Sequence, residues 1–199
     1  MEKPASPQFP IHELLKHRWS PRGFADRPVE PEKLQSLFEA ARWTASSYNG
    51  QPWNFVIATR EQPEDFERML TCFVETNSAW AKSAPVIGIS VAKLHFDHNG
   101  TPNRHAYHDT GQAAATLAIQ AVALGLQLHQ LAGIHVDRAR EVLSIPEGYD
   151  PVAGLAIGYP GNPHTLPEKL RERELAVRQR KPAESFVYAG HWGKKSSIF

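Results

Sequence analysis

The stretch from residue 109 to residue 128 constrains the fold more than any other part of the sequence. It is rich in Ala, Leu, Ile and Gln, and its apolar residues fall on most faces of a helix. This pattern predicts a long helix at the centre of the molecule. Asp109 or Thr110 is placed to cap its start. Gly125 lies in its last third, so the helix is expected to end near His129.

Shorter elements surround this segment. Apolar residues at helical spacing predict helices over 31–43, 63–76, 137–143 and 167–178. Nearly continuous apolar or β-branched runs predict strands over 53–59, 85–92 and 152–159. Helices that alternate with few strands favour an α+β fold of three layers, in which helices cover a central sheet.

Composition and charge narrow the class of protein. A chain of 199 residues with 41% apolar and 22% charged residues is expected to form a single soluble domain, residues 1–199. Its 22 Lys and Arg nearly balance its 21 Asp and Glu, so neither nucleic acid nor an anionic membrane is expected as a partner. No apolar run reaches the length of a membrane span.

Two features bear on location. Residues 1–10 contain charged and proline residues without an apolar segment, so they do not read as a signal peptide. Cys72 is the only cysteine, which fits a reducing cytoplasm. We expect a cytoplasmic protein in which Cys72 fills the core rather than acting as a reactive thiol.

Two cationic motifs are candidates for an anion site. Arg18 and Arg22 flank Ser20, a combination suited to phosphate and polyol oxygens, although surface arginines show the same pattern. Arg178 and Arg180 form a second short cluster, which either closes on an anion bound elsewhere or is a solvated charge run.

A polar loop carries a second kind of signal. Ser46, Ser47, Asn49 and Gln51 lie between a predicted helix and a predicted strand. Their hydroxyl and amide groups suit the hydrogen-bonding edge of a heterocycle, but a turn built from turn-forming residues is equally consistent.

Four motifs, taken together, point to a known family. They are Arg-Trp-Ser-Pro-Arg at 18–22, Ser-Ser-Tyr-Asn-Gly-Gln-Pro-Trp at 46–53, Gly-Tyr-Pro at 158–160 and Arg-Lys-Pro at 180–182. In order and rough spacing they resemble the FMN-dependent nitroreductase family, from about residue 11 to residue 192. The motif at 46–53 is the most specific part of the resemblance.

The resemblance implies a nitroreductase-like three-layer fold with a core at about 11–182 and a central mixed, mainly antiparallel sheet. It also implies a homodimer with two FMN sites in the subunit interface, each lined by both chains. A C-terminal arm at about 183–199 would wrap the partner subunit. That role would account for the apolar tail, which contains Phe186, Val187, Tyr188, Trp192 and Phe199.

The resemblance also assigns roles by position. Arg18 and Ser20 would hold the FMN phosphate together with Arg178 and Arg180. Arg22 would lie near the ribityl chain and the flavin N1 and O2 edge, where positive charge stabilises reduced flavin. Trp19 belongs to the same motif and is bulkier than is common there.

Other predicted contacts concern the flavin ring. Ser46, Ser47 and Asn49 match positions that contact flavin across the interface, and Gln51 fixes their loop. A turn that passes near flavin N5 is matched by two further residues, Ala132 and Gly133. Ala45 replaces a common proline in this loop, and Tyr48 is bulkier than usual.

The implied chemistry needs no protein nucleophile, catalytic residue or metal. Hydride from NADH or NADPH would reach the flavin and then a small electrophile such as a nitroaromatic, a quinone or an activated alkene, in a ping-pong cycle. Tyr48 or His129 would shape the acceptor pocket.

Two other functions stay open. One is an FMN storage or sensing protein without turnover. The other is a metal-dependent hydrolase that uses His95, Asp97, His98, His105, His108 and Asp109, a cluster that matches no strong metal-binding signature.

Overall fold

The computed structural model describes residues 2–199. Its sheet has four strands in the order β1-β2-β4-β3, namely β1 (Trp53–Thr59), β2 (Val86–Lys93), β4 (Tyr149–Gly158) and β3 (Gln127–Leu131). Each pair of neighbours is antiparallel. The predicted α+β class is confirmed, but the sheet formed by the described residues has no parallel pair.

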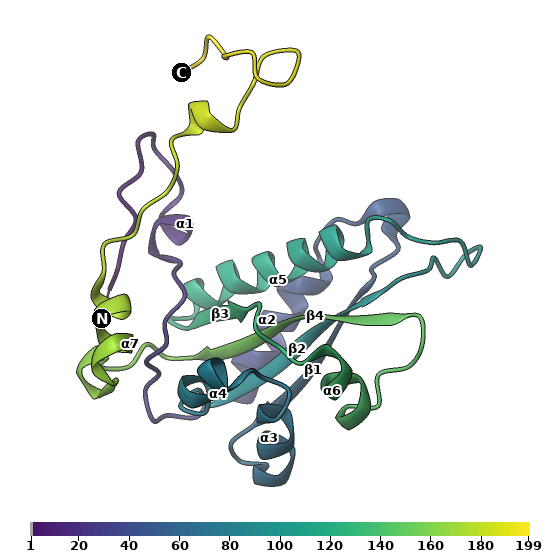
Figure 1. Ribbon diagram of the computed structural model, residues 1–199, viewed down its shortest axis with the longest axis vertical. Helices are drawn as coiled ribbons and strands as arrows, with labels where there is room; N and C mark the ends of the chain where they lie inside the picture. Colours follow the sequence, from purple (N-terminus) through teal and green to yellow (C-terminus); the bar gives the residue numbers. More distant parts are fainter. Residues whose placement is uncertain (1) are drawn as a thin grey trace.

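One face of the sheet is covered by α2 (Pro31–Arg42) and the long helix α5 (Ala106–Ala123), as Figure 1 shows. Leu37 of α2 and Leu117 of α5 are fully buried there against Leu155 of β4. Because side chains alternate along a strand, Val86 of β2 points to this face while its neighbour Ile87 points to the other.

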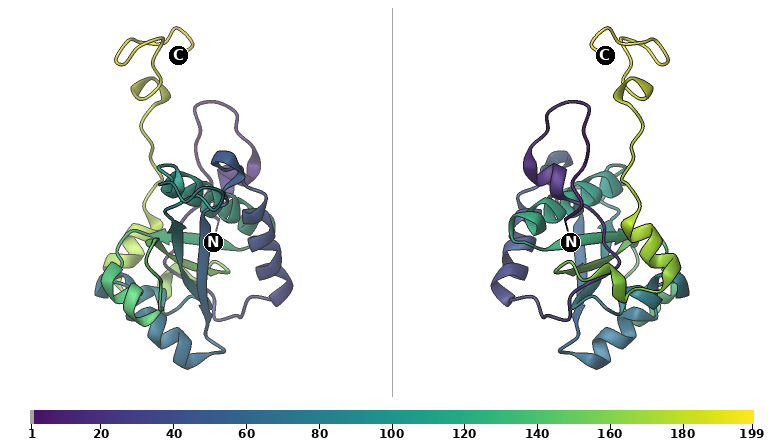
Figure 2. Two further views of the ribbon diagram at one scale, coloured as in Figure 1. Left: turned by 90° about the vertical axis from the view of Figure 1, so that its right-hand side faces the viewer. Right: turned by 90° about the vertical axis from the view of Figure 1, so that its left-hand side faces the viewer.

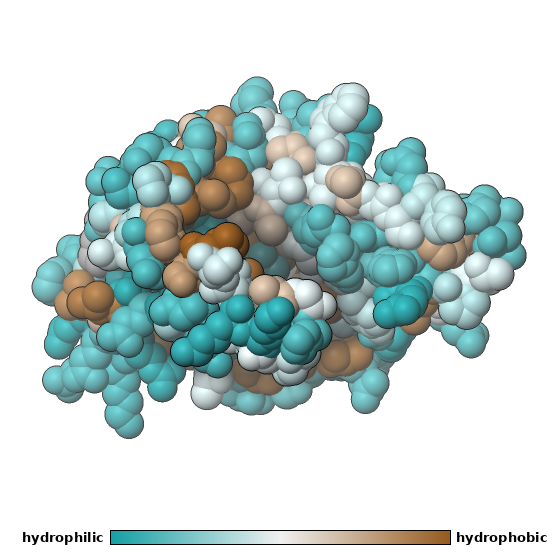
Figure 3. Space-filling model, turned by 90° about the horizontal axis from the view of Figure 1, so that it is seen from above, coloured by the Kyte–Doolittle hydropathy of each residue, from teal (hydrophilic) through white to brown (hydrophobic). Residues whose placement is uncertain are grey.

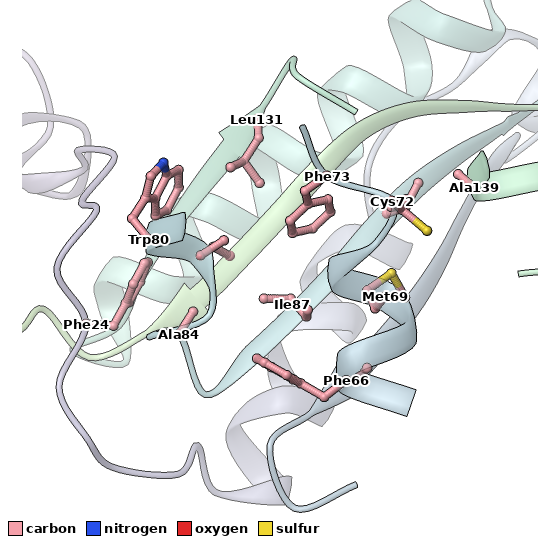
Figure 4. Packing of buried hydrophobic residues seen from close by; sticks show 14 of the residues in the cluster. Phe24, Phe66, Met69, Cys72, Phe73, Trp80, Ala84, Ile87, Leu131 and Ala139 are labelled. Atoms are coloured by element: carbon pink, nitrogen blue, oxygen red, sulfur yellow. The ribbon is translucent and has the colours of Figure 1, made fainter. Parts of the chain in front are cut away.

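The opposite face carries α3 (Pro63–Leu70), α4 (Glu75–Ala81) and α6 (Val136–Val142). Figure 4 shows the buried side chains of this layer packed over the sheet, among them Phe66, Met69 and Trp80 from the helices and Cys72 and Phe73 from the segment between α3 and α4. Cys72 has no exposed surface, as predicted for core filler, and burial raises the pKa of its thiol. The three predicted layers are therefore present.

The prediction of a helix to near His129 is wrong at its end. α5 stops at Ala123, and Gly125 takes a φ of +75°, a conformation that glycine adopts without strain and that commonly terminates helices. The next five residues, Gln127–Leu131, form β3 along β4. Asp109 and Thr110 do not cap the helix either, because His105 occupies the N-cap.

Two other predicted helices differ in extent. The helix expected over 63–76 is two helices, because residues 71–74 turn to pair with the segment after β3, where Phe73 bridges Ile134. The helix expected over 167–178 is only α7 (Glu168–Leu175). None of the helices in residues 2–199 has the length and hydropathy needed to cross a bilayer.

A loop of the N-terminal segment and the C-terminal tail project from this body on the same side (Figures 1 and 2), whereas Lys3 lies back at the body and donates a hydrogen bond to the carbonyl of Glu174. The N-terminal segment leads into α1 (Glu13–His17), and the C-terminal segment follows α7. The rings of Phe9 and Phe199 lie 5.8 Å apart. Beyond α7 the chain exposes large apolar side chains, including Phe186 and Trp192, which is 87% exposed. The tail at 183–199 is extended, and its role as an arm around a partner stays a prediction.

Candidate functional site

Three arginines from distant parts of the chain meet in one pocket. Arg18 follows α1, whereas Arg178 and Arg180 follow α7, and all three line a hollow of about 500 Å³ with residues 5–9. Ser20 lies beside them, since Arg18 Nη1 donates a hydrogen bond to its Oγ at 3.3 Å. The structure thus brings together the two cationic motifs that the sequence separates by about 160 residues.

The positive charge of this pocket lacks a carboxylate partner within residues 2–199. No ion pair in that part of the chain includes Arg18, Arg178 or Arg180. Burial lowers the pKa of Arg18, and the two neighbouring arginines lower it further. Guanidinium groups nevertheless stay charged in proteins, so the three like charges favour an anion with several oxygens.

A second pocket, of about 660 Å³, adjoins the first. Leu15 and Arg18 line both. Ala115 and Ile119 of α5 and Gln130 of β3 also line the second pocket. Seen from above, hydrophobic side chains gather around a hollow on this side of the molecule (Figure 3). A cationic pocket beside a mostly apolar one suits a ligand with a phosphate at one end and a flat ring at the other.

Trp19 packs inward instead of lining either pocket. Its side chain is only 6% exposed and borders a separate hollow with Leu126. Gln127 fixes the main chain on both sides of Arg18: it accepts a hydrogen bond from the Trp19 N–H and donates one to the carbonyl of His17, each at 3.1 Å. The bulk of Trp19 is therefore accommodated in the interior.

The turn after Ser20 is held by a buried carboxylate. Glu174 of α7 is 2% exposed, and it accepts hydrogen bonds from the N–H groups of Arg22 and Gly23 at 3.0 Å. The carboxylate therefore links the end of α7 to the segment that carries Arg18. It thereby also positions the arginines that follow α7. Arg22 itself lies 6.0 Å from the ring of Trp80.

Ala132 and Gly133 form the turn after β3, as predicted. The carbonyl of Gly133 accepts hydrogen bonds from the Val74 N–H at 3.2 Å and from Asn77 Nδ2 at 3.1 Å. A Cβ on Gly133 would lie 2.5 Å from Asn77 Nδ2, so a larger residue there requires the Asn77 side chain to move. Ala132 is exposed at the same turn.

The polar loop lies apart from these pockets within one chain. Ser46, Ser47, Asn49 and Gln51 line neither of them. The Ser47 N–H donates to Asp109 at 2.9 Å, in the first turn of α5. Along the helix, that turn is roughly 9 to 17 Å from the residues of α5 that border the second pocket. One chain therefore contains two separate groups of predicted residues.

Tyr48 and His129 have opposite surroundings. Tyr48 is 84% exposed and contacts the ring of Phe96 edge-on, with centroids 5.8 Å apart. His129 faces the α4 layer, 4.6 Å from the ring of Trp80, and its Nδ1 donates to the carbonyl of Pro21 at 2.7 Å. Burial lowers the pKa of His129 to about 4, so it is a neutral packing residue rather than an exposed acceptor contact.

The histidines between residues 95 and 109 do not form a metal centre. Within the described part of the chain, no three His, Cys, Asp or Glu side chains gather in a way that would hold a metal ion. His95 instead pairs with Pro102 across a β-bridge, and the ring of His98 is tilted by 48° against that of Phe96, with centroids 5.2 Å apart.

Sequence reasoning missed three polar residues that position the site. The sequence places Gln127 near the end of a predicted helix, Glu174 in the predicted helix over 167–178, and Asp109 at a helix cap or in a metal cluster. Their roles depend on main-chain N–H groups that lie far away in sequence. Only the polarity of Gln127, between apolar neighbours, gave a signal.

The comparisons with known proteins agree with this geometry. The family model described as the nitroreductase family matches residues 15–159. A crystal structure described as an oxidoreductase containing FMN superimposes with a TM-score of 0.91. It is 36% identical in sequence, and the match covers 96% of this chain and 97% of that one.

Named relatives match over shorter or more distant alignments. The nitrobenzene nitroreductase of Ectopseudomonas oleovorans is 37% identical over 75 residues, 38% of this chain and 32% of that protein. The FMN reductase [NAD(P)H] of Bacillus subtilis is 25% identical over 192 residues, 85% of this chain and 75% of that protein. For the curated relatives that are 37 to 39% identical, the match spans only 27 to 60% of their lengths.

Proposed function

Because the chain belongs to the nitroreductase family, we propose that it binds FMN and acts as an NAD(P)H-dependent oxidoreductase. The observation that carries the proposal is the pocket of three arginines without carboxylate partners, which adjoins an apolar pocket large enough for a flat ring. The likeness to an FMN-containing oxidoreductase over 96% of the chain supports the choice of cofactor.

The residues present fit this cofactor. Arg18, Ser20, Arg178 and Arg180 would hold its phosphate through charge-assisted hydrogen bonds. The main chain of Ala132 and Gly133 would lie along the ring. Bound FMN supplies hydride transfer between a nicotinamide cofactor and an electron acceptor. The protein supplies orientation, a cationic field from Arg22 and surroundings with little water.

The proposal includes a homodimer. Tyr107, Gly111 and Ala115 on the outer face of α5 are exposed, although the opposite face of the helix is buried in the core. A helix that is apolar on most faces requires cover on that side too. A second subunit on α5 would supply this cover and bring its own residues 46–51 to the flavin. The arm at 183–199 would wrap it, starting from Phe186.

For the acceptor we propose small electrophiles: nitroaromatics, quinones or activated alkenes. Two relatives with matching segments are named nitrobenzene and chloronitrobenzene nitroreductases, and another is named an FMN reductase that uses NAD(P)H. A cytoplasmic location is part of the proposal and rests on the single, buried cysteine.

The first test is the visible spectrum of the purified protein, with released cofactor identified by mass. Flavin bands at one FMN per chain are expected. Arg18→Ala and Arg180→Ala should each weaken FMN binding by about 10- to 100-fold, because a charge-assisted hydrogen bond contributes on the order of 1.5 to 3 kcal/mol. Arg173→Ala, which removes one exposed charge from α7, should bind FMN like the native protein. Equal affinity in all four proteins would refute the site.

Turnover is tested on the same preparation. NADH or NADPH should bleach the flavin bands without oxygen, and a quinone or nitroarene should restore them. Bound flavin that neither nucleotide reduces would favour storage or sensing instead.

A further inference from the structure

The loop that carries Ser46, Ser47 and Asn49 has an unusual main chain. Tyr48, Asn49 and Gln51 all have positive φ, of 51°, 52° and 45°. L-residues rarely adopt this left-handed conformation, and each instance costs free energy that the surrounding structure must offset. Of the three, only Asn adopts it readily. The loop therefore needs contacts that hold its shape.

The strongest of these contacts is a buried carboxylate. Asp109 is only 2% exposed, and its Oδ2 accepts a hydrogen bond from the Ser47 N–H at 2.9 Å. Its Oδ1 lies 3.1 Å from His108 Nδ1 and 3.4 Å from Gln112 Nε2. Both carboxylate oxygens are thus satisfied. Hydrogen bonds to an ionised acceptor are about twice as strong as neutral ones.

Helix capping does not explain this carboxylate. Asp109 lies in the first turn of α5, yet neither of its oxygens accepts from a main-chain N–H of its own helix. The contact instead joins two segments that are 62 residues apart. A buried charge that serves a strained loop, rather than its own helix, indicates a positioning role.

Further contacts complete the support. Ser46 Oγ accepts from the Gln51 N–H at 3.0 Å, which closes the loop on itself. On the other side, a Cβ at Gly50 would lie 3.3 Å from the ring of Phe96. The loop is therefore held between α5 and the segment after β2, and Asp109 is its only buried charged contact among the described residues.

We infer that Asp109 is a positioning residue for flavin binding: through the Ser47 N–H it fixes the left-handed loop that presents Ser46, Ser47 and Asn49 to the cofactor. The inference rests on the proposed function and adds a residue to it. Asp109 itself touches no cofactor. Substitution of Asp109 should therefore weaken FMN binding only by disturbing the loop.

The first set of variants changes the carboxylate. Asp109→Ala should raise the Kd for FMN about tenfold, the effect of losing one hydrogen bond to a charged group. Asp109→Asn keeps an oxygen that accepts from the Ser47 N–H and should restore affinity to within about threefold of native. Leu117→Val is the control, because it loosens the fully buried core contact of the same helix without touching the loop. It should lower Tm without changing Kd.

A second pair isolates the hydrogen bond. Ser47→Ala removes only the hydroxyl. Ser47→Pro also removes the N–H, and proline fits there because Ser47 opens a 3₁₀ turn and Ser46 is extended (φ −148°, ψ 157°). The proline variant should bind FMN about tenfold more weakly than the alanine variant. This pair tests the inference even if Asp109→Ala fails to fold.

The possible outcomes distinguish a failure of the proposed function from a failure of the positioning role. If native protein binds no FMN, the proposed function fails and the inference falls with it. If native protein binds FMN but Ser47→Pro matches Ser47→Ala, the positioning role is refuted alone. It is also refuted if Asp109→Ala and Asp109→Asn bind equally well, or if affinity follows Tm across all variants, Leu117→Val included.

Discussion

The largely buried imidazole of His129 should make the stability of the protein depend on pH. Burial lowers its pKa to about 4, with Arg22 and Arg18 acting in the same direction against the hydrogen bond to Pro21. In the unfolded chain its pKa returns to about 6.5. Between these values the unfolded state binds more protons than the folded state. Stability is therefore fully present above about pH 7 and is lost as the pH falls toward 4.

The size of the effect follows from the two pKa values. A difference of about 2.5 units corresponds to roughly 3 kcal/mol in total, of which about 2 kcal/mol is lost by pH 5. Urea unfolding of the native protein and of His129→Gln, at pH 5, 6, 7 and 8, measures it. Glutamine stays neutral and retains an N–H donor for the Pro21 carbonyl. Subtracting the two curves removes the contribution of other titrating groups.

The free-energy difference between native protein and His129→Gln should favour the native protein most at pH 8 and decrease by about 2 kcal/mol at pH 5. A difference that stays constant across this range would refute a buried neutral imidazole. A native protein that gains stability relative to His129→Gln on acidification would mean that the imidazole is charged in the fold.

Two further predictions concern the flavin turn and the dimer. Gly133→Ala should destabilise the protein by about 1 to 3 kcal/mol, because its Cβ would meet Asn77 and Val74 at 2.5 and 2.7 Å. Thermal unfolding measures this, and Gly133→Ala in an Asn77→Ala background should lose less. In a heterodimer of one Arg18→Ala chain and one Asp109→Ala chain, sites shared between subunits would leave one intact FMN site per dimer. Two equally weakened sites in a titration would contradict sharing.

Local patterns predicted the elements whose signals lie within a short window. The strand over 53–59 was predicted with its observed bounds, because aromatic and β-branched residues follow each other there. The helix over 31–43 was predicted to within one residue. β3 was missed because Gln127–Leu131 continues the Leu- and Gln-rich composition of α5, and its strand conformation comes from pairing with β4.

The residues of the candidate site also differ in how far the sequence alone predicts them. Arg18 and Arg180 belong to motifs that the sequence shows, but no periodicity predicts that the two residues lie together. The resemblance to a family predicted it, and both residues line the first pocket. The supporting residues are less accessible to sequence reasoning. Glu174 lies among charged neighbours on α7, and nothing local shows that its carboxylate is buried against the Arg22 N–H.

The anchoring of Arg178 has a thermodynamic consequence. Its Nη1 donates to the main-chain carbonyls of Lys3 at 2.8 Å and of Lys16 at 3.0 Å, so the side chain is held in place by the fold. Ordering a mobile long side chain on binding costs roughly 0.5 to 1.5 kcal/mol. For Arg178 that entropy is lost during folding, so its guanidinium is already ordered when an anion binds. Less of the favourable contact energy is then offset by lost side-chain entropy, and the affinity for the anion is higher.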